Sequence, residues 1–176
     1  MIAPSSGTGA GEVAWSRLIP PEQWRVLTDG TVAISSDGTE AKSFSILDGM
    51  GLKLLEKAGI ATAWISGRAS GATTARATEL KIPHLVQGRV DKITALQELA
   101  VKLGLQPEEC AYMGDDDIDA PAIAWAGLGV APPEAMPTAL AAADYVTTRR
   151  AGHGAVREVC ELLLATRGAK SGSKRK

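Results

Sequence analysis

A dense run of acidic side chains, "MGDDDIDAP" at residues 113–121, is the strongest candidate for chemistry in this sequence. Directly after an apolar stretch, four carboxylates occupy five positions, on Asp115, Asp116, Asp117 and Asp119. Carboxylates this close repel one another, and Mg²⁺ prefers carboxylate oxygens as ligands. The run also suits a helix N-terminus, where an acidic side chain caps free N–H groups. We hypothesise that Asp115 binds Mg²⁺, with Asp116 and Asp119 supporting the site.

Two shorter motifs carry groups that suit a phosphate. In "ISGR", Ser66 offers a hydroxyl, the N-terminus of the helix that follows offers free N–H groups, and Arg68 could place a guanidinium on an anionic substrate. In "VDKITAL", Lys92 starts an expected helix, where a cation opposes the helix dipole, and this mild cost indicates a nearby anion. Taken singly, Ser66 also reads as an ordinary helix cap.

Short apolar segments alternate with helical ones, which predicts βαβ crossovers and a parallel sheet. The expected helices include one that ends at Gly104 and others near 117–126, 133–142 and 154–165. We expect an α/β fold with a Rossmann-like, doubly wound parallel sheet and a β-hairpin insertion at 31–47, turning at Asp37-Gly38. Ligands of such sheets bind beyond the carboxyl ends of the strands. The segments that follow the expected strands are therefore candidates: residues 66–68, 87–92, 114–117 and 149–154.

The composition narrows the class of protein. The 176 residues carry a formal net charge of −1, so no overall field favours nucleic acid. No apolar run is long enough to cross a membrane, and the N-terminus lacks a signal-peptide pattern. Cys110 and Cys160 have no metal-binding spacing and are expected as buried free thiols, which favours a cytoplasmic location.

The two ends differ from the middle of the chain. Residues 1–16 are rich in small and polar side chains and are expected to be disordered. Residues 17–166 are expected to form one domain. Residues 167–176, "RGAKSGSKRK", are expected to form a basic, flexible tail.

Ser66 at one strand end, Lys92 at the next helix start and "GDDDID" at the following strand end form an ordered series. This series resembles motifs two to four of the haloacid dehalogenase superfamily, and most closely its small capless members, the 3-deoxy-D-manno-octulosonate 8-phosphate phosphatases. The shared features run from Val26 to Leu164: the hairpin, "DGMG", "ISGR", "GRVDK", "AYMGDDDID" and "GHGAVREVCELLL".

The resemblance implies a Mg²⁺-dependent hydrolase of a phosphorylated acidic sugar, without a cap domain, that serves lipopolysaccharide precursor synthesis. It implies catalytic roles for Ser66 and Lys92, and substrate contacts from Asp48, Gly67 and Arg68. For Asp48 a simple turn-and-cap role is an equal alternative. It also implies a homotetramer, and an isolated hairpin is marginally stable, so the hairpins are expected to pack together at its centre.

The first motif departs from this family. "VLTDG" at residues 26–30 matches the end of the family's Asp-x-Asp-Gly-Val-Leu-Thr-Asp-Gly, so the two leading aspartates are replaced by Glu22 and Trp24. In the family, one aspartate attacks phosphorus and the other protonates the leaving alcohol. Glu22 is one methylene longer, and Trp24 has no titratable proton. Upstream, Pro20 and Pro21 are poor residues for a central strand.

Three interpretations of this departure remain open. The chain is a non-catalytic homologue that binds a sugar phosphate or assembles with copies of itself. Alternatively, the N-terminal segment does not represent the working protein, or another residue is the nucleophile. His153, in "AGHGA", stands where the family often has arginine; it is either a surface histidine or a contact to a neighbouring subunit's ligand.

Overall fold

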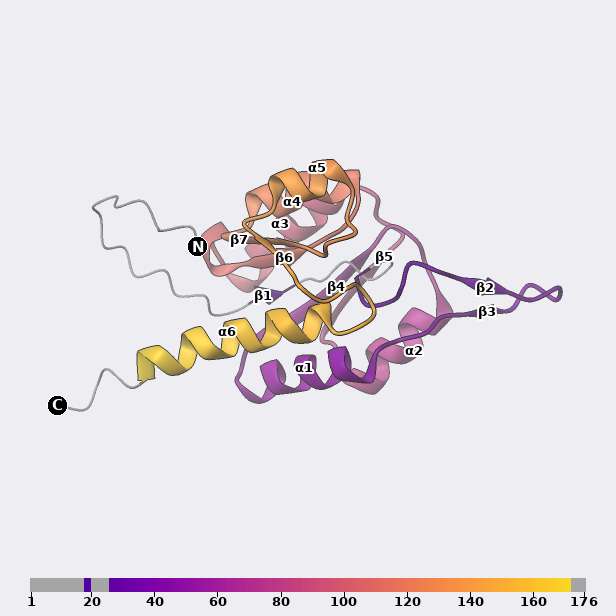
Figure 1. The fold of residues 1–176 in the computed structure, drawn as a ribbon, viewed down its shortest axis with the longest axis horizontal. Helices are drawn as coiled ribbons and strands as arrows, with labels where there is room; N and C mark the ends of the chain where they lie inside the picture. The colour runs from indigo at the N-terminus through magenta and orange to yellow at the C-terminus, as the bar shows by residue number, and fades with distance from the viewer. Residues whose placement is uncertain (1–17, 20–25, 172–176) are drawn as a thin grey trace.

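The structure, a computed structural model, describes the backbone of residues 18–19 and 26–171 and the side chains of residues 26–166. Short strands alternate with helices along the chain (Figure 1). The strands are β1 (Leu18–Ile19), β2 (Ala33–Ile34), β3 (Glu40–Ala41), β4 (Ala61–Ser66), β5 (His84–Gln87), β6 (Ala111–Met113), β7 (Leu128–Ala131) and β8 (Tyr145–Val146). The helices are α1 (Ile46–Lys57), α2 (Gly71–Leu80), α3 (Lys92–Leu103), α4 (Ala120–Trp125), α5 (Pro137–Ala142) and α6 (Ala155–Ser171), with 3₁₀ turns η1 (Pro107–Glu109) and η2 (Asp117–Asp119).

Two parallel three-stranded sheets, β1-β4-β5 and β6-β7-β8, form the centre of the fold. Because β1 also lies next to β6, the two sheets meet at β1. The expected α/β class with a parallel sheet is therefore confirmed. β1 has only two described residues, Leu18 and Ile19, which pair with Ala61 and Thr62 of β4.

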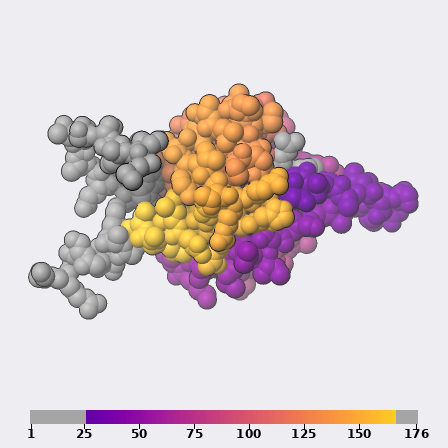
Figure 2. Space-filling view, in the orientation of Figure 1, coloured from indigo at the N-terminus to yellow at the C-terminus, as the bar shows by residue number. Residues whose placement is uncertain are grey.

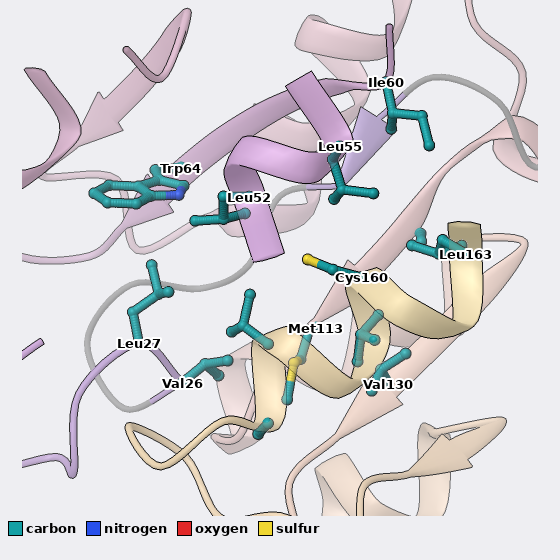
Figure 3. Packing of buried hydrophobic residues seen from close by; sticks show 14 of the residues in the cluster. Val26, Leu27, Leu52, Leu55, Ile60, Trp64, Met113, Val130, Cys160 and Leu163 are labelled. Carbon is teal, nitrogen blue, oxygen red and sulfur yellow. The ribbon is translucent and has the colours of Figure 1, made fainter. Parts of the chain in front are cut away.

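Helices cover both faces of the sheet, so the fold is doubly wound. Along β4, the side chain of Trp64 packs with α1, α2 and α6, whereas Ala63 and Ile65 pack with α3, α4 and α5. This alternation follows from the two-residue period of a strand. Figure 3 shows the first layer, in which Leu52 of α1 and Cys160 of α6 point into one apolar cluster.

The predicted hairpin is present and projects from the body of the molecule (Figures 1 and 2). β2 and β3 pair antiparallel, with Ala33 opposite Ala41. At the turn, Gly38 donates its N–H to the carbonyl of Ser35 at 2.9 Å, and Asp37 accepts the hydroxyl of Thr39 at 2.7 Å. The hairpin therefore closes at Asp37-Gly38, where the sequence predicted its turn.

Three helix boundaries differ from those predicted. The single helix expected near 117–126 is divided into η2 and α4, with proline at the start of α4. The helix expected from about 133 begins at Pro137, because residues that precede a proline avoid the helical region. α6 continues to Ser171, six residues beyond the helix end expected at 165, in a stretch whose alanine, lysine and arginine favour helix.

Several expectations fall on residues that the structure does not describe. They are the disorder of 1–16, the end of the basic tail at 172–176, and the replacements Glu22 and Trp24. Within the described part of the chain, no helix is long and apolar enough to cross a membrane. Cys110 and Cys160 are buried and free, as the sequence predicted.

Candidate active site

A fully buried ion pair joins Lys92 to Asp119. Nζ of Lys92 lies 3.0 Å from Oδ1 of Asp119, and both side chains are 0% exposed. Lys92 begins α3 and Asp119 ends η2, so the pair joins two strand-to-helix connections at one edge of the sheet. Burial lowers the pKa of Lys92, and the charge of Asp119 opposes that shift. The position of Lys92 at the start of a helix indicated a nearby anion. The carboxylate of Asp119 is such an anion, so the protein itself supplies at least part of this negative charge.

Asp119 also holds the turn that carries the acidic run. Its Oδ2 accepts the N–H of Asp115 at 3.3 Å and that of Asp116 at 3.0 Å, and its Oδ1 accepts the hydroxyl of Tyr112 at 2.7 Å. A Cβ on Gly114 would lie 2.4 Å from the Cβ of Asp119. Glycine is thus required for Asp119 to approach this turn so closely.

Asp115 is 5% exposed and lies in the wall of a pocket of about 450 Å³. The pocket is lined by Asp29, Gly30, Asp115, Glu134, Arg150, Ala151 and His153. Asp116 and Asp119 are not among these residues. Asp116 accepts the N–H of Asp117 at 2.8 Å, and the carboxylate of Asp117 accepts the hydroxyl of Thr138.

The donor set around Asp115 fits Mg²⁺ as a partial site. Within the described residues, no group of three or more His, Cys, Asp or Glu side chains gathers to hold a metal. Mg²⁺ does not need such a group, since it keeps several waters and uses one or two carboxylates together with substrate phosphate. Asp115, a carboxylate on the wall of an open polar pocket, is suited to be one such ligand.

Two distant segments of the chain form another wall of the pocket. Gly152 donates its N–H to the carbonyl of Val26 at 2.9 Å. Its φ is +68°, and a Cβ there would lie 2.5 Å from the carbonyl carbon of Thr28. This contact places His153 beside Asp29, whose charge interacts with that histidine. A hydrogen bond from the hydroxyl of Thr31 lowers the pKa of Asp29.

Glu134 is a pocket residue that sequence reasoning did not identify. Its Oε1 accepts the N–H of Ala151 at 2.7 Å, and its Oε2 lies 3.8 Å from Nε of Arg150. Glu134 follows β7, so the rule that directs attention to the carboxyl ends of strands also applies to it. The four candidate segments predicted from the sequence do not include the end of this strand.

Ser66 and Arg68 lie at the end of β4. Ser66 is fully buried, and its hydroxyl donates to the carbonyl of Arg68 at 2.8 Å. The carbonyl of Ser66 accepts the N–H of Arg89 at 3.1 Å, which ties this loop to the one that leads into α3. The guanidinium of Arg68 lies 2.5 Å from Oε2 of Glu40 in the hairpin. Gly67, between them, is half-buried.

Asp48 has the turn-and-cap role that was the alternative to a substrate contact. It is 0% exposed and accepts the N–H of Gly154 at 3.2 Å and of Arg157 at 2.8 Å. Its carboxylate therefore caps the start of α6 and is not among the residues that line the pocket. His153, in contrast, does line it.

Comparison with known proteins agrees with this geometry. A profile of haloacid dehalogenase-like hydrolases matches residues 42–159. A 3-deoxy-D-manno-octulosonate 8-phosphate phosphatase of Yersinia pestis is 45% identical over 139 residues, which are 79% of this chain and 74% of that protein. The crystal structure of the Moraxella catarrhalis 3-deoxy-D-manno-octulosonate 8-phosphate phosphatase, in complex with magnesium ion, phosphate ion and KDO, has a TM-score of 0.85 and 44% identity, covering 87% of this chain and 88% of that one.

A cobalt-bound phosphatase from Haemophilus influenzae is also similar, with a TM-score of 0.85 and 34% identity over 90% of this chain and 92% of that one. The resemblance read from the motifs is confirmed. The chain belongs to the haloacid dehalogenase-like hydrolases and, within them, to the group of the 3-deoxy-D-manno-octulosonate 8-phosphate phosphatases.

Proposed function

We propose that this chain is a Mg²⁺-dependent phosphatase of 3-deoxy-D-manno-octulosonate 8-phosphate, and that Glu22 and Trp24 limit its turnover. The observation that carries the proposal is the buried Lys92–Asp119 pair beside Asp115, at the carboxyl edge of the parallel strands, where α/β folds bind their ligands. A buried charge pair of this kind is costly, so its retention indicates a use beyond stability. The similarity to magnesium-bound and phosphate-bound relatives supports the substrate.

Four residues that match the family motifs each have a separate role in binding the metal or the substrate. Asp115 contributes a carboxylate ligand to Mg²⁺, and that ion offsets the charge of the phosphoryl group when bound. Ser66 exchanges its hydrogen bond to the Arg68 carbonyl for one to a phosphoryl oxygen. Lys92 adds positive charge near the same group, oriented by Asp119. Arg68 contacts the acidic sugar.

A second candidate, a non-catalytic homologue that binds a sugar phosphate, is favoured by one observation in the sequence. Glu22 and Trp24 stand where the nucleophile and the acid are expected. In-line attack is sensitive to a displacement of about 1 Å, and the longer Glu22 shifts its carboxylate by about that much. Such a protein would bind the sugar phosphate with Mg²⁺ and release no phosphate.

Phosphate release from a panel of phosphosugars with and without Mg²⁺ separates the two candidates. For the phosphatase we expect slow release that depends on Mg²⁺ and is fastest with 3-deoxy-D-manno-octulosonate 8-phosphate. Calorimetric binding of that sugar phosphate without release would support the second candidate. Absence of both binding and release would reject both. Alanine at Ser66 is the matched control, because it removes the hydroxyl proposed to hold the phosphate.

We also propose a homotetramer with the hairpins at its centre. Four large apolar side chains on or near the hairpin are exposed: Ile34, Ile46, Leu47 and Met50. Figure 2 shows how far the hairpin stands out from the body, and a surface of this kind is typical of an interface. Light scattering at micromolar concentration should give four times the chain mass, and a stable monomer would reject the proposal.

The buried, free thiols of Cys110 and Cys160 support a cytoplasmic location, since reducing compartments keep thiols unpaired. Cell fractionation of the native protein tests this, and recovery in an oxidising compartment would contradict it.

A further inference from the structure

The hydroxyl of Tyr112 is hydrogen-bonded to the buried Asp119 but has no role in the proposed function. Tyr112 is the middle residue of β6 and is 0% exposed. Its neighbours Ala111 and Met113 pack on the opposite face of the sheet, so its ring lies in the layer formed by α3, α4 and α5. Its hydroxyl donates a hydrogen bond to Oδ1 of Asp119 at 2.7 Å.

Packing alone does not explain a tyrosine at this position. A phenylalanine would fill almost the same space in the apolar layer, whereas a buried hydroxyl is costly unless it has a hydrogen-bond partner. The partner here is the oxygen of Asp119 that also accepts Lys92 at 3.0 Å. Burial raises the pKa of Tyr112 well above its ordinary value, so the hydroxyl remains a donor at any physiological pH.

Four donors from the described residues reach the carboxylate of Asp119. Tyr112 and Lys92 donate to Oδ1, and the N–H groups of Asp115 and Asp116 donate to Oδ2. A carboxylate held at both oxygens has one orientation, and the turn hydrogen-bonded to Oδ2 is fixed with it. Tyr112 thus holds Oδ1 of Asp119, while the turn that carries Asp115 is bonded to Oδ2.

We propose that Tyr112 is a positioning residue that acts through Asp119 to aim the carboxylate of Asp115 at Mg²⁺. The inference rests on the magnesium site of the proposed function. Partners that orient a metal ligand directly change metal affinity by about 10- to 100-fold when they are lost. Tyr112 acts one step further out, so we expect a smaller effect, about 3- to 10-fold.

The test is Mg²⁺ titration of Tyr112→Phe by calorimetry, next to the unmodified chain. Tyr145→Phe is the matched control, because its hydroxyl also donates to a carboxylate, Oε1 of Glu158, at 2.7 Å. We expect weaker Mg²⁺ binding only in Tyr112→Phe. Thermal unfolding without Mg²⁺ shows whether both variants fold, and phenylalanine in the same space is expected to preserve folding.

A second comparison separates positioning from loss of packing. Because the hydroxyl acts through Asp119, the double variant Tyr112→Phe/Asp119→Asn should bind Mg²⁺ as Asp119→Asn does alone. In steady-state kinetics Tyr112→Phe should lower kcat and leave the KM for the sugar phosphate unchanged.

The outcomes are distinct. Equal Mg²⁺ affinity in Tyr112→Phe and the unmodified chain overturns the positioning role, as does an unmodified chain that binds no Mg²⁺. If Mg²⁺ binding weakens as expected but no chain releases phosphate, the positioning role stands and the phosphatase proposal fails.

Discussion

Glu40 holds Arg68 across the junction between the hairpin and the core, with 2.5 Å between Oε2 and the guanidinium nitrogen. The other oxygen of Glu40 accepts the hydroxyl of Ser70 at 2.5 Å and lies 3.4 Å from Nζ of Lys42. The carboxylate of Glu40 thus pairs with two cationic side chains, those of Arg68 and Lys42. Because Glu40 belongs to β3 and Arg68 follows β4, the position of a proposed substrate contact depends on the hairpin.

The first prediction is that Glu40→Ala weakens binding of the sugar phosphate. Arg68, which is 47% exposed, would lose the partner that orients it. We expect the dissociation constant to rise about 3- to 10-fold, equivalent to about 0.7–1.4 kcal/mol, with stability changed by less than about 1 kcal/mol. Calorimetry measures the first effect and urea unfolding the second.

Glu98→Ala is the control for that prediction, since Glu98 pairs with Arg89 at 3.0 Å on the surface outside the pocket. Unchanged sugar-phosphate affinity in Glu40→Ala would show that Arg68 does not depend on its hydrogen bond to the hairpin for binding the substrate.

The second prediction concerns the metal. Asp115→Asn should lower Mg²⁺ affinity at least about tenfold, because a neutral amide replaces the carboxylate ligand. Asp117→Asn, two residues away and hydrogen-bonded to Thr138, should bind Mg²⁺ like the unmodified chain. Isothermal calorimetry compares the two variants, and equal losses would remove Asp115 as the ligand.

The third prediction concerns the buried ion pair. Lys92→Met leaves the charge of Asp119 buried with one donor fewer, and such a change typically costs about 3–5 kcal/mol of unfolding free energy. The double variant Lys92→Met/Asp119→Leu should recover part of that loss. Glu161→Ala, which breaks a surface pair with Arg157 at 2.7 Å, should cost no more than about 1 kcal/mol. Denaturant unfolding that shows a similar cost for the buried and the surface pair would contradict this.

The fourth prediction is a pH dependence of stability from Asp48. Burial raises its pKa above the ordinary 3.8, despite the N–H groups of Gly154 and Arg157. A carboxyl group with a raised folded-state pKa contributes stability that is fully present below its unfolded-state pKa and is lost as pH rises through the folded value. In Asp48→Asn the side chain does not titrate, so this contribution to the pH dependence of stability is absent.

The unfolding free energy of the unmodified chain should therefore fall relative to that of Asp48→Asn as pH rises above about 3.8. Urea unfolding from pH 3.5 upward measures it. Parallel pH profiles for the two proteins would mean that Asp48 titrates alike in the folded and unfolded states.

The fifth prediction concerns the positions outside the described residues. Glu22→Asp, Trp24→Asp and Arg25→Gly together should not raise phosphate release by themselves, because Pro20 and Pro21 are poor residues for the strand that aims the nucleophile. A partial increase is expected only when both prolines are also changed to valine or leucine. Ser66, Lys92 and Asp115 should each become essential in that variant.

Turnover by the unmodified chain at an ordinary enzymatic rate, about 1–10³ per second, would show either that residues 22–25 are aligned with the first motif in the wrong register or that another residue is the nucleophile.

Much of this fold could be predicted from periodicity. The parallel strands, the hairpin turn at Asp37-Gly38 and the end of α3 at Gly104, whose φ is +66°, all follow from local sequence. Helix starts near prolines were less accurate, because a helical pattern of apolar residues does not show where a proline prevents the first turn. Pro137 and the division of α4 from η2 are the examples here.

Local sequence indicated individual candidate residues but not the contacts among them. Local sequence pointed to Lys92 and Asp119 separately, and only the fold shows that they pair. The role of Asp48 could not be decided from sequence, since its partners in α6 lie more than 100 positions away. Tyr112 gave no local signal, because an aromatic residue in a strand is common, whereas Glu134 follows a strand and could have been found from the rule for strand ends.

The hydrogen bond from Gly152 to Val26 also bears on the order in which the protein matures. It joins the start of the described domain to a loop near its end, so this wall of the pocket cannot form while the ribosome still holds residue 152. Contacts of such large sequence separation form slowly, because a long loop must close before they contribute stability. We expect the pocket to be among the last parts of the protein to form, after the α1–β4–α2 region has already folded.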